Sequence, residues 1–267
     1  MRMLRMAVCM KQVPGDIGKS LSADGRIRRD APSSIINPAD VFSLETALTL
    51  KEQHTGQVDI FTMGTETARS LLKETATLGA DGLFLVSDGD FAGADTYATA
   101  FVLAAALRKT AVYDLIFCGR RTLDGETGQV SIQIAEMLGI PVVTNVIQLD
   151  WMEGTVVCRR LLEGGEEIVE TKMPALISVL EGMENIDHPR LPSVFAMRNA
   201  AKRPIVLLDR ETLGLKKEEV GSAGSYTEVK RSFFPEWRRK CTFCSREEGL
   251  ELIQKKLEQS RKGGGQK

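Results

Sequence analysis

The stretch CGRRTLDGETGQV, from Cys118 to Val130, decides the fold because it joins an apolar run to a helical run. It carries three glycines, two adjacent arginines and two carboxylates between YDLIF at 113–117 and SIQIAEMLGI at 131–140. Backbone amides at the start of a helix lack intrahelical partners and lie at the positive end of the helix dipole. A glycine-rich turn from a strand into a helix therefore favours phosphate binding.

Individual residues of the turn fit this interpretation. Its two later glycines let a ligand approach the main chain closely and permit positive φ. Arg120 and Arg121 can supply positive charge to a diphosphate. Thr127 can cap the helix that we expect over 127–138, or can donate its hydroxyl to a ligand.

The turn matches neither of the two common glycine motifs for phosphate. Gly125 is followed by Glu126 with no Lys-Ser/Thr pair, so it is not a Walker A loop, and it is not a dinucleotide GxGxxG. The alternative is a solvated turn with a helix cap, in which Arg120 and Arg121 are a solvated pair. Asp124 and Glu126 have no histidine or nucleophile nearby, which favours turn formation and hydrogen bonds to a ribose or the backbone over acid–base catalysis. We expect no catalytic residue.

Short β-rich runs alternate with longer helical patterns on the amino-terminal side of this turn. The expected strands are 3–10, 57–64, 82–87 and 113–119, and the expected helices are 38–53, 65–78, 95–110 and 127–138. Asn37 is the expected N-cap of the first helix, with Pro38 at its first position and Asp40 near its positive end. The alternation predicts an α/β fold with a Rossmann-like parallel sheet, whose ligands bind beyond the carboxyl ends of the strands.

The pattern changes after Val146. Residues 146–173 predict antiparallel strands with turns at two glycine-containing pairs, and 174–182 predicts one more core strand. Regular periodicity ends near Met183, apart from a short helix near Glu211. We therefore expect a nucleotide-binding α/β domain over 1–200 and a C-terminal arm over 201–267.

The arm ends in an amphipathic helical pattern. Ser245 and Glu248 stand in capping-box register, and Leu250, Ile253 and Leu257 fall on one face. This apolar face has no evident partner in the chain, so we expect the arm to pack on another subunit.

Composition narrows the classes of partner and compartment. The net charge of −1 gives no reason to expect nucleic acid or an anionic membrane as a partner, although 228–267 carries eleven Lys/Arg against six Asp/Glu. No segment reaches the roughly 18 uninterrupted apolar residues of a membrane span. The 5 cysteines are an odd number and lie mostly in apolar runs. This indicates free thiols in a reducing compartment, and we expect a cytoplasmic protein.

The cysteines are not expected to hold a metal. Cys241 and Cys244, in CTFC, have the spacing of a metal knuckle, but the 2 histidines, His54 and His188, stand in other contexts. Spare thiols or an inter-subunit contact are expected there instead. Cys9, within the first strand, is expected to fill apolar space.

Three motifs together resemble the beta subunit of electron-transferring flavoproteins. They are VCMKQVP at 8–14, INPADVFSLETALTLKE at 36–52 and the turn CGRRTLDGETGQV, and they occur in the order of that family. The resemblance runs from the N-terminus to about Leu257. It implies a sheet of the adenine-nucleotide alpha hydrolase type and a heterodimer with an alpha subunit.

The resemblance also implies which residues surround an adenine nucleotide. Four segments of the family pattern contribute, each at the end of a strand or the start of a helix. In this chain they are Cys9; Asn37, Pro38, Ala39 and Asp40; Met63; and Gly119, Arg120, Arg121, Thr122, Leu123, Asp124, Gly125, Glu126, Thr127, Gly128, Gln129 and Val130.

The family contains two kinds of beta subunit. One kind holds a structural AMP, and the other, found in flavin-based bifurcating complexes, holds FAD. The form DGETGQV is more similar to the FAD type. The resemblance then implies electron transfer between NADH or a flavin dehydrogenase and other carriers, with ferredoxin or flavodoxin as an acceptor where the complex bifurcates.

This sequence departs from the family pattern at several positions. Arg121 replaces the usual Gln, Thr122 the usual Ala, and Ser131-Ile132 the usual Gly-Pro, while Gly15 is inserted after the first motif. These departures leave the fold expectation intact and bear on bifurcation. An ATP-using enzyme on the same sheet is the rival of another class, but the pyrophosphate signature SGGxDS is absent from the sequence. A stand-alone nucleotide sensor is a further alternative.

Overall fold

The computed structural model describes residues 3–15, 34–182, 190–230 and 243–263. Its contacts divide the chain into two compact units, Met1–Arg231 and Ser232–Lys267, which are described separately. This division falls after Arg231, whereas the sequence pattern predicted a domain boundary after residue 200.

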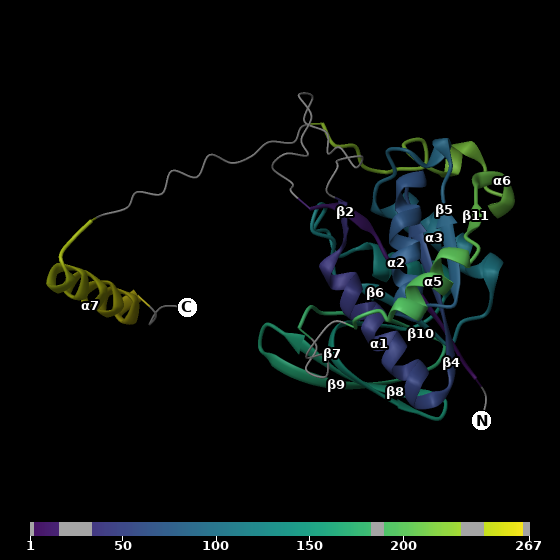
Figure 1. The fold of residues 1–267 in the computed structure, drawn as a ribbon. Helices are drawn as coiled ribbons and strands as arrows, with labels where there is room; N and C mark the ends of the chain where they lie inside the picture. Colours follow the sequence, from purple (N-terminus) through teal and green to yellow (C-terminus); the bar gives the residue numbers. More distant parts are fainter. Residues whose placement is uncertain (1–2, 16–33, 183–189, 231–242, 264–267) are drawn as a thin grey trace. The chain divides into compact units, whose positions relative to one another are not determined.

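The first unit contains a mostly parallel sheet (Figure 1). Within the described residues the sheet has 9 strands in the order β11-β5-β4-β1-β6-β10-β7-β8-β9. Their bounds are β1 Leu4–Cys9, β4 Gly56–Met63, β5 Gly82–Val86, β6 Leu115–Gly119, β7 Val142–Met152, β8 Thr155–Leu162, β9 Gly165–Lys172, β10 Ala175–Val179 and β11 Val206–Leu208. The pairs from β11 to β7 are parallel, and β7, β8 and β9 pair antiparallel. The predicted α/β class and the antiparallel addition are confirmed.

Helices cover both faces of the sheet. The helices of the first unit are α1 Pro38–His54, α2 Arg69–Leu78, α3 Thr96–Thr110, α4 Val130–Leu138, α5 Val194–Lys202 and α6 Arg210–Leu213, with short 3-10 turns η1 Glu66–Ala68, η2 Gly89–Phe91 and η3 Lys217–Glu219. Along β1, Met6 and Val8 join the core under α1 and α2, whereas Ala7 and Cys9 join the core under α3 and α4. This alternation follows from the period of two along a strand.

The first turn of α4 corrects one expected boundary. The sequence predicted a helix from Thr127, but α4 begins at Val130. Glu126 has a φ of 50° and Gly128 a φ of 63°, which lie in the left-handed region and cannot continue a right-handed helix. The turn is therefore longer than expected, and Thr127 lies outside the helix.

A helix also forms after Met183, where the sequence lacks a regular hydrophobic period. The helix α5 begins at an N-cap, Ser193, whose Oγ accepts the amide of Ala196 at 3.1 Å. At its other end Lys73 of α2 donates to the carbonyls of Ala200 and Ala201 at 3.3 and 3.0 Å. A cation at the carboxyl end of a helix is favourable, so the hydrogen bonds from Lys73 stabilise α5.

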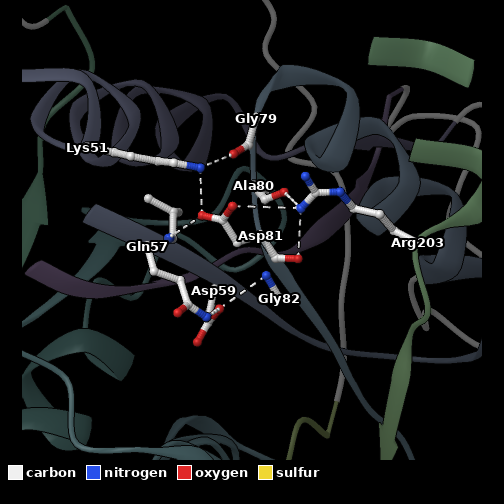
Figure 2. Close-up of polar contacts among 9 residues, drawn as sticks. Lys51, Gln57, Asp59, Gly79, Ala80, Asp81, Gly82 and Arg203 are labelled. Atoms are coloured by element: carbon white, nitrogen blue, oxygen red, sulfur yellow. Dashed lines mark hydrogen bonds and ion pairs between the residues drawn. The ribbon is translucent and has the colours of Figure 1, made fainter. Parts of the chain in front are cut away.

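A polar network lies at the amino end of the parallel strands β4 and β5 (Figure 2). Asp81, just before β5, accepts Lys51 Nζ of α1 at 2.6 Å and the amide of Val58 at 2.9 Å. Lys51 also donates to the carbonyl of Gly79 at 2.8 Å, and the Arg203 guanidinium donates to the carbonyl of Asp81 at 2.9 Å. The network therefore joins α1, the turn before β5 and the segment that follows α5.

Asp59 of β4 extends this network into the core. Its side chain, in a residue only 1% exposed, accepts Gln57 Nε2 at 2.9 Å, the amide of Gly82 at 3.1 Å and the hydroxyl of Tyr113 at 2.9 Å. Burial and the neighbouring Asp59 carboxylate raise the pKa of Tyr113 well above its usual value, so the phenol stays a donor. Arg5 completes the cluster, with its Nη2 at 3.8 Å from the Asp59 carboxylate.

A separate two-stranded sheet lies beside the entry to α1. Its strands, β2 Gln12–Pro14 and β3 Ser34–Ile36, pair antiparallel. The amide of Asn37 continues this pairing by donating to the carbonyl of Lys11 at 2.9 Å. The small sheet therefore fixes the start of α1 against the chain that leaves β1.

The second unit contains α7, Arg246–Gly263. The predicted capping box is confirmed, because Ser245 Oγ accepts the amide of Glu248 at 3.3 Å and the Glu248 carboxylate accepts the amide of Ser245 at 2.8 Å. Leu250, Ile253 and Leu257 are each about 60% exposed.

Candidate functional site

The glycine-rich turn leaves the carboxyl end of β6, a central strand that pairs with β1 on one side and β10 on the other. The turn occupies 119–129 and ends at the first turn of α4. Its position is the one that the parallel-sheet rule predicts for a ligand. The amide of Arg120 donates to the carbonyl of Val179 in β10 at 2.8 Å, which fixes where the turn leaves the sheet.

Gly119 permits a close approach between the turn and α1. A Cβ at this position would lie 2.8 Å from the Cβ of Ala39 and would also collide with the Asp40 carboxylate. Ala39 is fully buried at the start of α1. Only a residue without a side chain fits between β6 and α1 here.

Asp40 joins the ends of two neighbouring strands. Its carboxylate accepts the amide of Lys11, after β1, at 2.7 Å and the amide of Gly119, at the end of β6, at 3.2 Å. Burial raises the pKa of Asp40 from 3.8 to about 7, although these hydrogen bonds act in the opposite direction. Asp40 lies in the first turn of α1 as predicted.

Asn37 holds the turn, which corrects its expected role as a helix cap. It occupies the N-cap position of α1 and Pro38 begins the helix, but the Asn37 side chain makes no capping hydrogen bond. Instead Nδ2 donates to the carbonyl of Arg121 at 3.0 Å, and Oδ1 accepts the amide of Leu123 at 3.0 Å. Asn37 is only 1% exposed.

Asp124 forms an ion pair that the sequence did not suggest. Lys11 Nζ donates to its two carboxylate oxygens at 2.7 and 2.8 Å, and the Asp124 side chain is 3% exposed. The partner is a lysine just after β1, within the KQVP motif. The only signal of this pair in the sequence is a basic residue at the carboxyl end of an expected strand. No local pattern reveals its partner, because the two residues are 113 positions apart.

Much of the turn faces solvent. Arg120, Arg121, Gly125, Glu126 and Thr127 are exposed. Arg121 Nη1 lies 3.7 Å from the Glu126 carboxylate, an exposed pair that contributes little to stability. The two guanidinium groups are therefore available to an anionic ligand.

The amino end of α4 keeps its donors. Gln129 occupies the N-cap position but makes no capping hydrogen bond with its side chain, whose Oε1 accepts the hydroxyl of Thr96 at 3.1 Å. The first-turn amides of a helix have no intrahelical acceptors. Val130, the last residue of the expected site, is the first of these donors.

Cys9 and Met63 lie at the same edge of the sheet. Cys9 pairs directly with Cys118 across β1 and β6, and both are buried. Its hydrogen bond to Cys9, together with burial, raises the pKa of the Cys118 thiol well above its usual value, which disfavours the reactive thiolate. Met63 ends β4, the neighbour of β1, and packs against the core under α3.

Among the described residues there is no group of three or more His, Cys, Asp or Glu that could hold a metal ion. Cys244 is exposed, whereas Cys241 and His188 lie outside the described residues. Within the same limits, no helix is both long and apolar enough to span a bilayer.

The geometry defines a class of protein. Three segments, 9–11, 37–40 and 119–124, contact one another at the carboxyl edge of a parallel sheet. They hold a turn with two outward arginines and an uncapped helix start, which suits the phosphates of a nucleotide. The fold is that of an α/β protein with a mostly parallel sheet, and its candidate site lies at the edge where such sheets bind ligands.

Comparison with known proteins then gives the family. Residues 24–213 match the family "Electron transfer flavoprotein domain". The caffeyl-CoA reductase-Etf complex subunit CarD of Acetobacterium woodii is 38% identical over 87% of this chain and 88% of its own length. The acryloyl-CoA reductase electron transfer subunit gamma of Anaerotignum propionicum is 36% identical over 87% and 89%. The electron transfer flavoprotein subunit beta of Thermoanaerobacterium thermosaccharolyticum is 38% identical over 88% and 90%. The chain belongs to the electron transfer flavoprotein beta subunit family.

Proposed function

We propose that this chain binds FAD at the turn 119–130 and, together with an alpha subunit, passes electrons between a flavin dehydrogenase or NADH and other carriers. The observation that carries the proposal is the turn itself. It is fixed at the carboxyl edge of the sheet, its two arginines are exposed, and the start of α4 has no side-chain cap.

The residues present fit the diphosphate of FAD. Because Gly119 has no side chain, the turn can lie directly against α1. The positive φ of Gly128 sets the direction from which α4 begins. The amides of α4 and the guanidinium groups of Arg120 and Arg121 would bind the phosphates. A bound flavin supplies the redox chemistry, and the protein supplies binding and orientation.

FAD rather than AMP is proposed on two grounds. The turn has the form DGETGQV, which is similar to the FAD type of the family. Two of the relatives are named as subunits of reductase complexes that contain an electron-transfer component. By this similarity we place the chain in such a complex, with ferredoxin or flavodoxin as the further acceptor if it bifurcates.

We also propose where the partners bind. The apolar face of α7 is exposed and suited to contact with an alpha subunit, so the arm would pack on the surface of that subunit. In the first unit, α5 and the residues before it expose Leu191, Val194 and Phe195 at 92%, 74% and 75%. Arg190 anchors this segment to Glu45 and Glu52 of α1, which makes it a firm surface for a dehydrogenase.

The test is to identify the nucleotide. The chain is co-expressed with its alpha subunit, the complex is purified and denatured, and the released nucleotides are quantified by mass spectrometry. The proposal predicts FAD in excess of one per heterodimer, with the excess lost when the turn is altered. One FAD together with one AMP would overturn the FAD assignment, because AMP would then occupy this subunit. A complex without any nucleotide attributable to this chain would overturn the site.

A further inference from the structure

We infer that Asn37 is a positioning residue, which with the Lys11–Asp124 ion pair holds the inner half of the turn in its binding shape before any ligand arrives. The inference rests on the proposed function of the turn. It assigns to Asn37 and Asp124 a role toward the protein, and leaves contact with the cofactor to the exposed arginines Arg120 and Arg121 and to residues 125–130.

The Asn37 side chain makes the pair of hydrogen bonds that the backbone of a neighbouring parallel strand would make. Its amide donates to the carbonyl of Arg121 and accepts from the amide of Leu123, at 3.0 Å each. A residue of a parallel strand makes the same pair of bonds to the two residues that flank its neighbour. Thr122 is thus held between two anchored residues, and its carbonyl accepts the amide of Glu126 at 2.8 Å.

Asn37 is itself fixed by its main chain. Its amide donates to the carbonyl of Lys11, and its carbonyl accepts the amide of Asp40, at 2.9 Å each. The following Pro38 has a restricted φ, which further reduces the freedom of this segment. The side-chain amide therefore reaches the turn from a rigid base.

A second anchor lies one residue beyond Leu123. The Asp124 carboxylate is bound by both hydrogen bonds from Lys11, and the amide of Lys11 is in turn bound to Asp40. Asp40 also accepts the amide of Gly119. The turn is held in this way at its first residue, at its middle and at Asp124, always by residues from 11 and 37–40.

These anchors divide the turn into two parts. Residues 119–124 are the held part. They bind the Asn37 side-chain amide, the Asp40 carboxylate and the Lys11 ammonium group within the protein. The part from 125 to 129 is mainly exposed and leads to the uncapped start of α4. A cofactor that took Asn37 or Asp124 as a side-chain ligand would have to displace these internal bonds, which favours the positioning role.

The experiment compares Asn37→Asp and Asn37→Ala with Gln53→Ala in the heterodimer. Gln53 is an exposed amide residue on the same helix and makes a matched control. Asn37→Asp keeps an acceptor for Leu123 but places a carboxylate against the Arg121 carbonyl. Two quantities are measured: hydrogen exchange at residues 121–124 after removal of nucleotide, and the affinities for FAD and AMP by titration calorimetry.

Both Asn37 variants are expected to raise exchange at 121–124 about tenfold and to weaken FAD and AMP by a similar factor, whereas Gln53→Ala changes neither. Weaker binding with unchanged exchange in the nucleotide-free protein would overturn the inference, since Asn37 would then be a ligand. Faster exchange in a protein whose unaltered form binds no nucleotide would leave the anchoring intact and overturn the proposed function instead.

A second variant covers the case in which the Asn37 variants do not fold. Asp124→Asn preserves size and removes the charge that Lys11 binds. It is expected to raise exchange around 124 and to weaken both nucleotides severalfold. Unchanged exchange and unchanged affinity in Asp124→Asn would contradict the second anchor.

Discussion

The two ends of the parallel strands use similar polar groups for different purposes. At the amino end, Lys51 and Arg203 both bind Asp81 and nearby carbonyls, so each of these groups has partners within the protein (Figure 2). At the carboxyl end, Asn37 and Asp40 also bind backbone groups, but the turn that they hold has two exposed arginines and leads to a helix start without a side-chain cap. We therefore take the network that leaves donors exposed as the candidate ligand site, and the network whose groups bind within the protein as a structural joint.

The largest effect is expected from closing the space at Gly119. In Gly119→Ala the new methyl group meets Ala39 and Asp40, so β6 and α1 must separate. We expect a loss of about 2–3 kcal/mol in the free energy of unfolding, together with release of nucleotide. Urea denaturation measures the first and cofactor content after gel filtration the second. Gly89→Ala, whose Cβ would have no neighbour within 4 Å, is the control, and equal losses in the two variants would refute the explanation.

The outward charges can be removed without touching the network that holds the turn. Arg120→Ala combined with Arg121→Ala should weaken nucleotide binding about 100-fold and change stability little, since neither side chain is buried. Calorimetric titration measures the affinity. Arg198→Ala with Lys202→Ala removes the same charge from exposed positions of α5 and should leave the affinity unchanged. Retention of cofactor by the double arginine variant would contradict the proposal that the exposed arginines at the carboxyl end bind the ligand.

Asp40 gives the carboxyl end a dependence on pH. Because its pKa is about 7 in the folded protein, against an ordinary value of 3.8, the native state holds a proton that the unfolded chain releases between these values. Its contribution to stability is therefore present at low pH and is lost as the pH rises through about 7. Urea denaturation between about pH 5 and about pH 8 should show this decline, of about 2–3 kcal/mol, in the unaltered protein and not in Asp40→Asn. Parallel profiles for the two proteins would contradict it.

The smallest effect is expected at the amino end. Asp81→Ala removes the partner of Lys51 and of the Val58 amide, and should cost about 1–2 kcal/mol of unfolding free energy with no change in nucleotide affinity. The control is Glu74→Ala, at an exposed position of α2, with an expected change below about 0.5 kcal/mol. A loss of nucleotide in Asp81→Ala would mean that the two ends are not independent.

The parts of the molecule that sequence predicted are those governed by local rules. Strand and helix alternation predicted the sheet, and Ser245 with Glu248 predicted the start of α7, because periodicity and capping act over a few residues. The turn was located because a strand, glycines and a helix adjoin in sequence.

The parts that sequence missed depend on distant contacts or outward-facing side chains. Asn37 satisfies the usual rule for an N-cap, but its amide binds a turn 84 positions away, which no local pattern signals. The partner of Asp124 is more distant still. The helix α5 was missed for another reason: Val194 and Phe195 face outward, so the helix has no buried stripe to create a period.

The position of β10 has a consequence for how the protein is made. β10 lies between β6 and β7, and both of these strands precede it in the chain. While the ribosome is still synthesising the long β7–β8–β9 excursion, both neighbours offer open hydrogen-bonding edges, which are sites of unwanted strand pairing. Insertion of Ala175–Val179 closes that gap and supplies the carbonyl of Val179 that seats Arg120. In the nascent chain, the turn 119–129 is thus seated on the sheet only after the central gap has been filled.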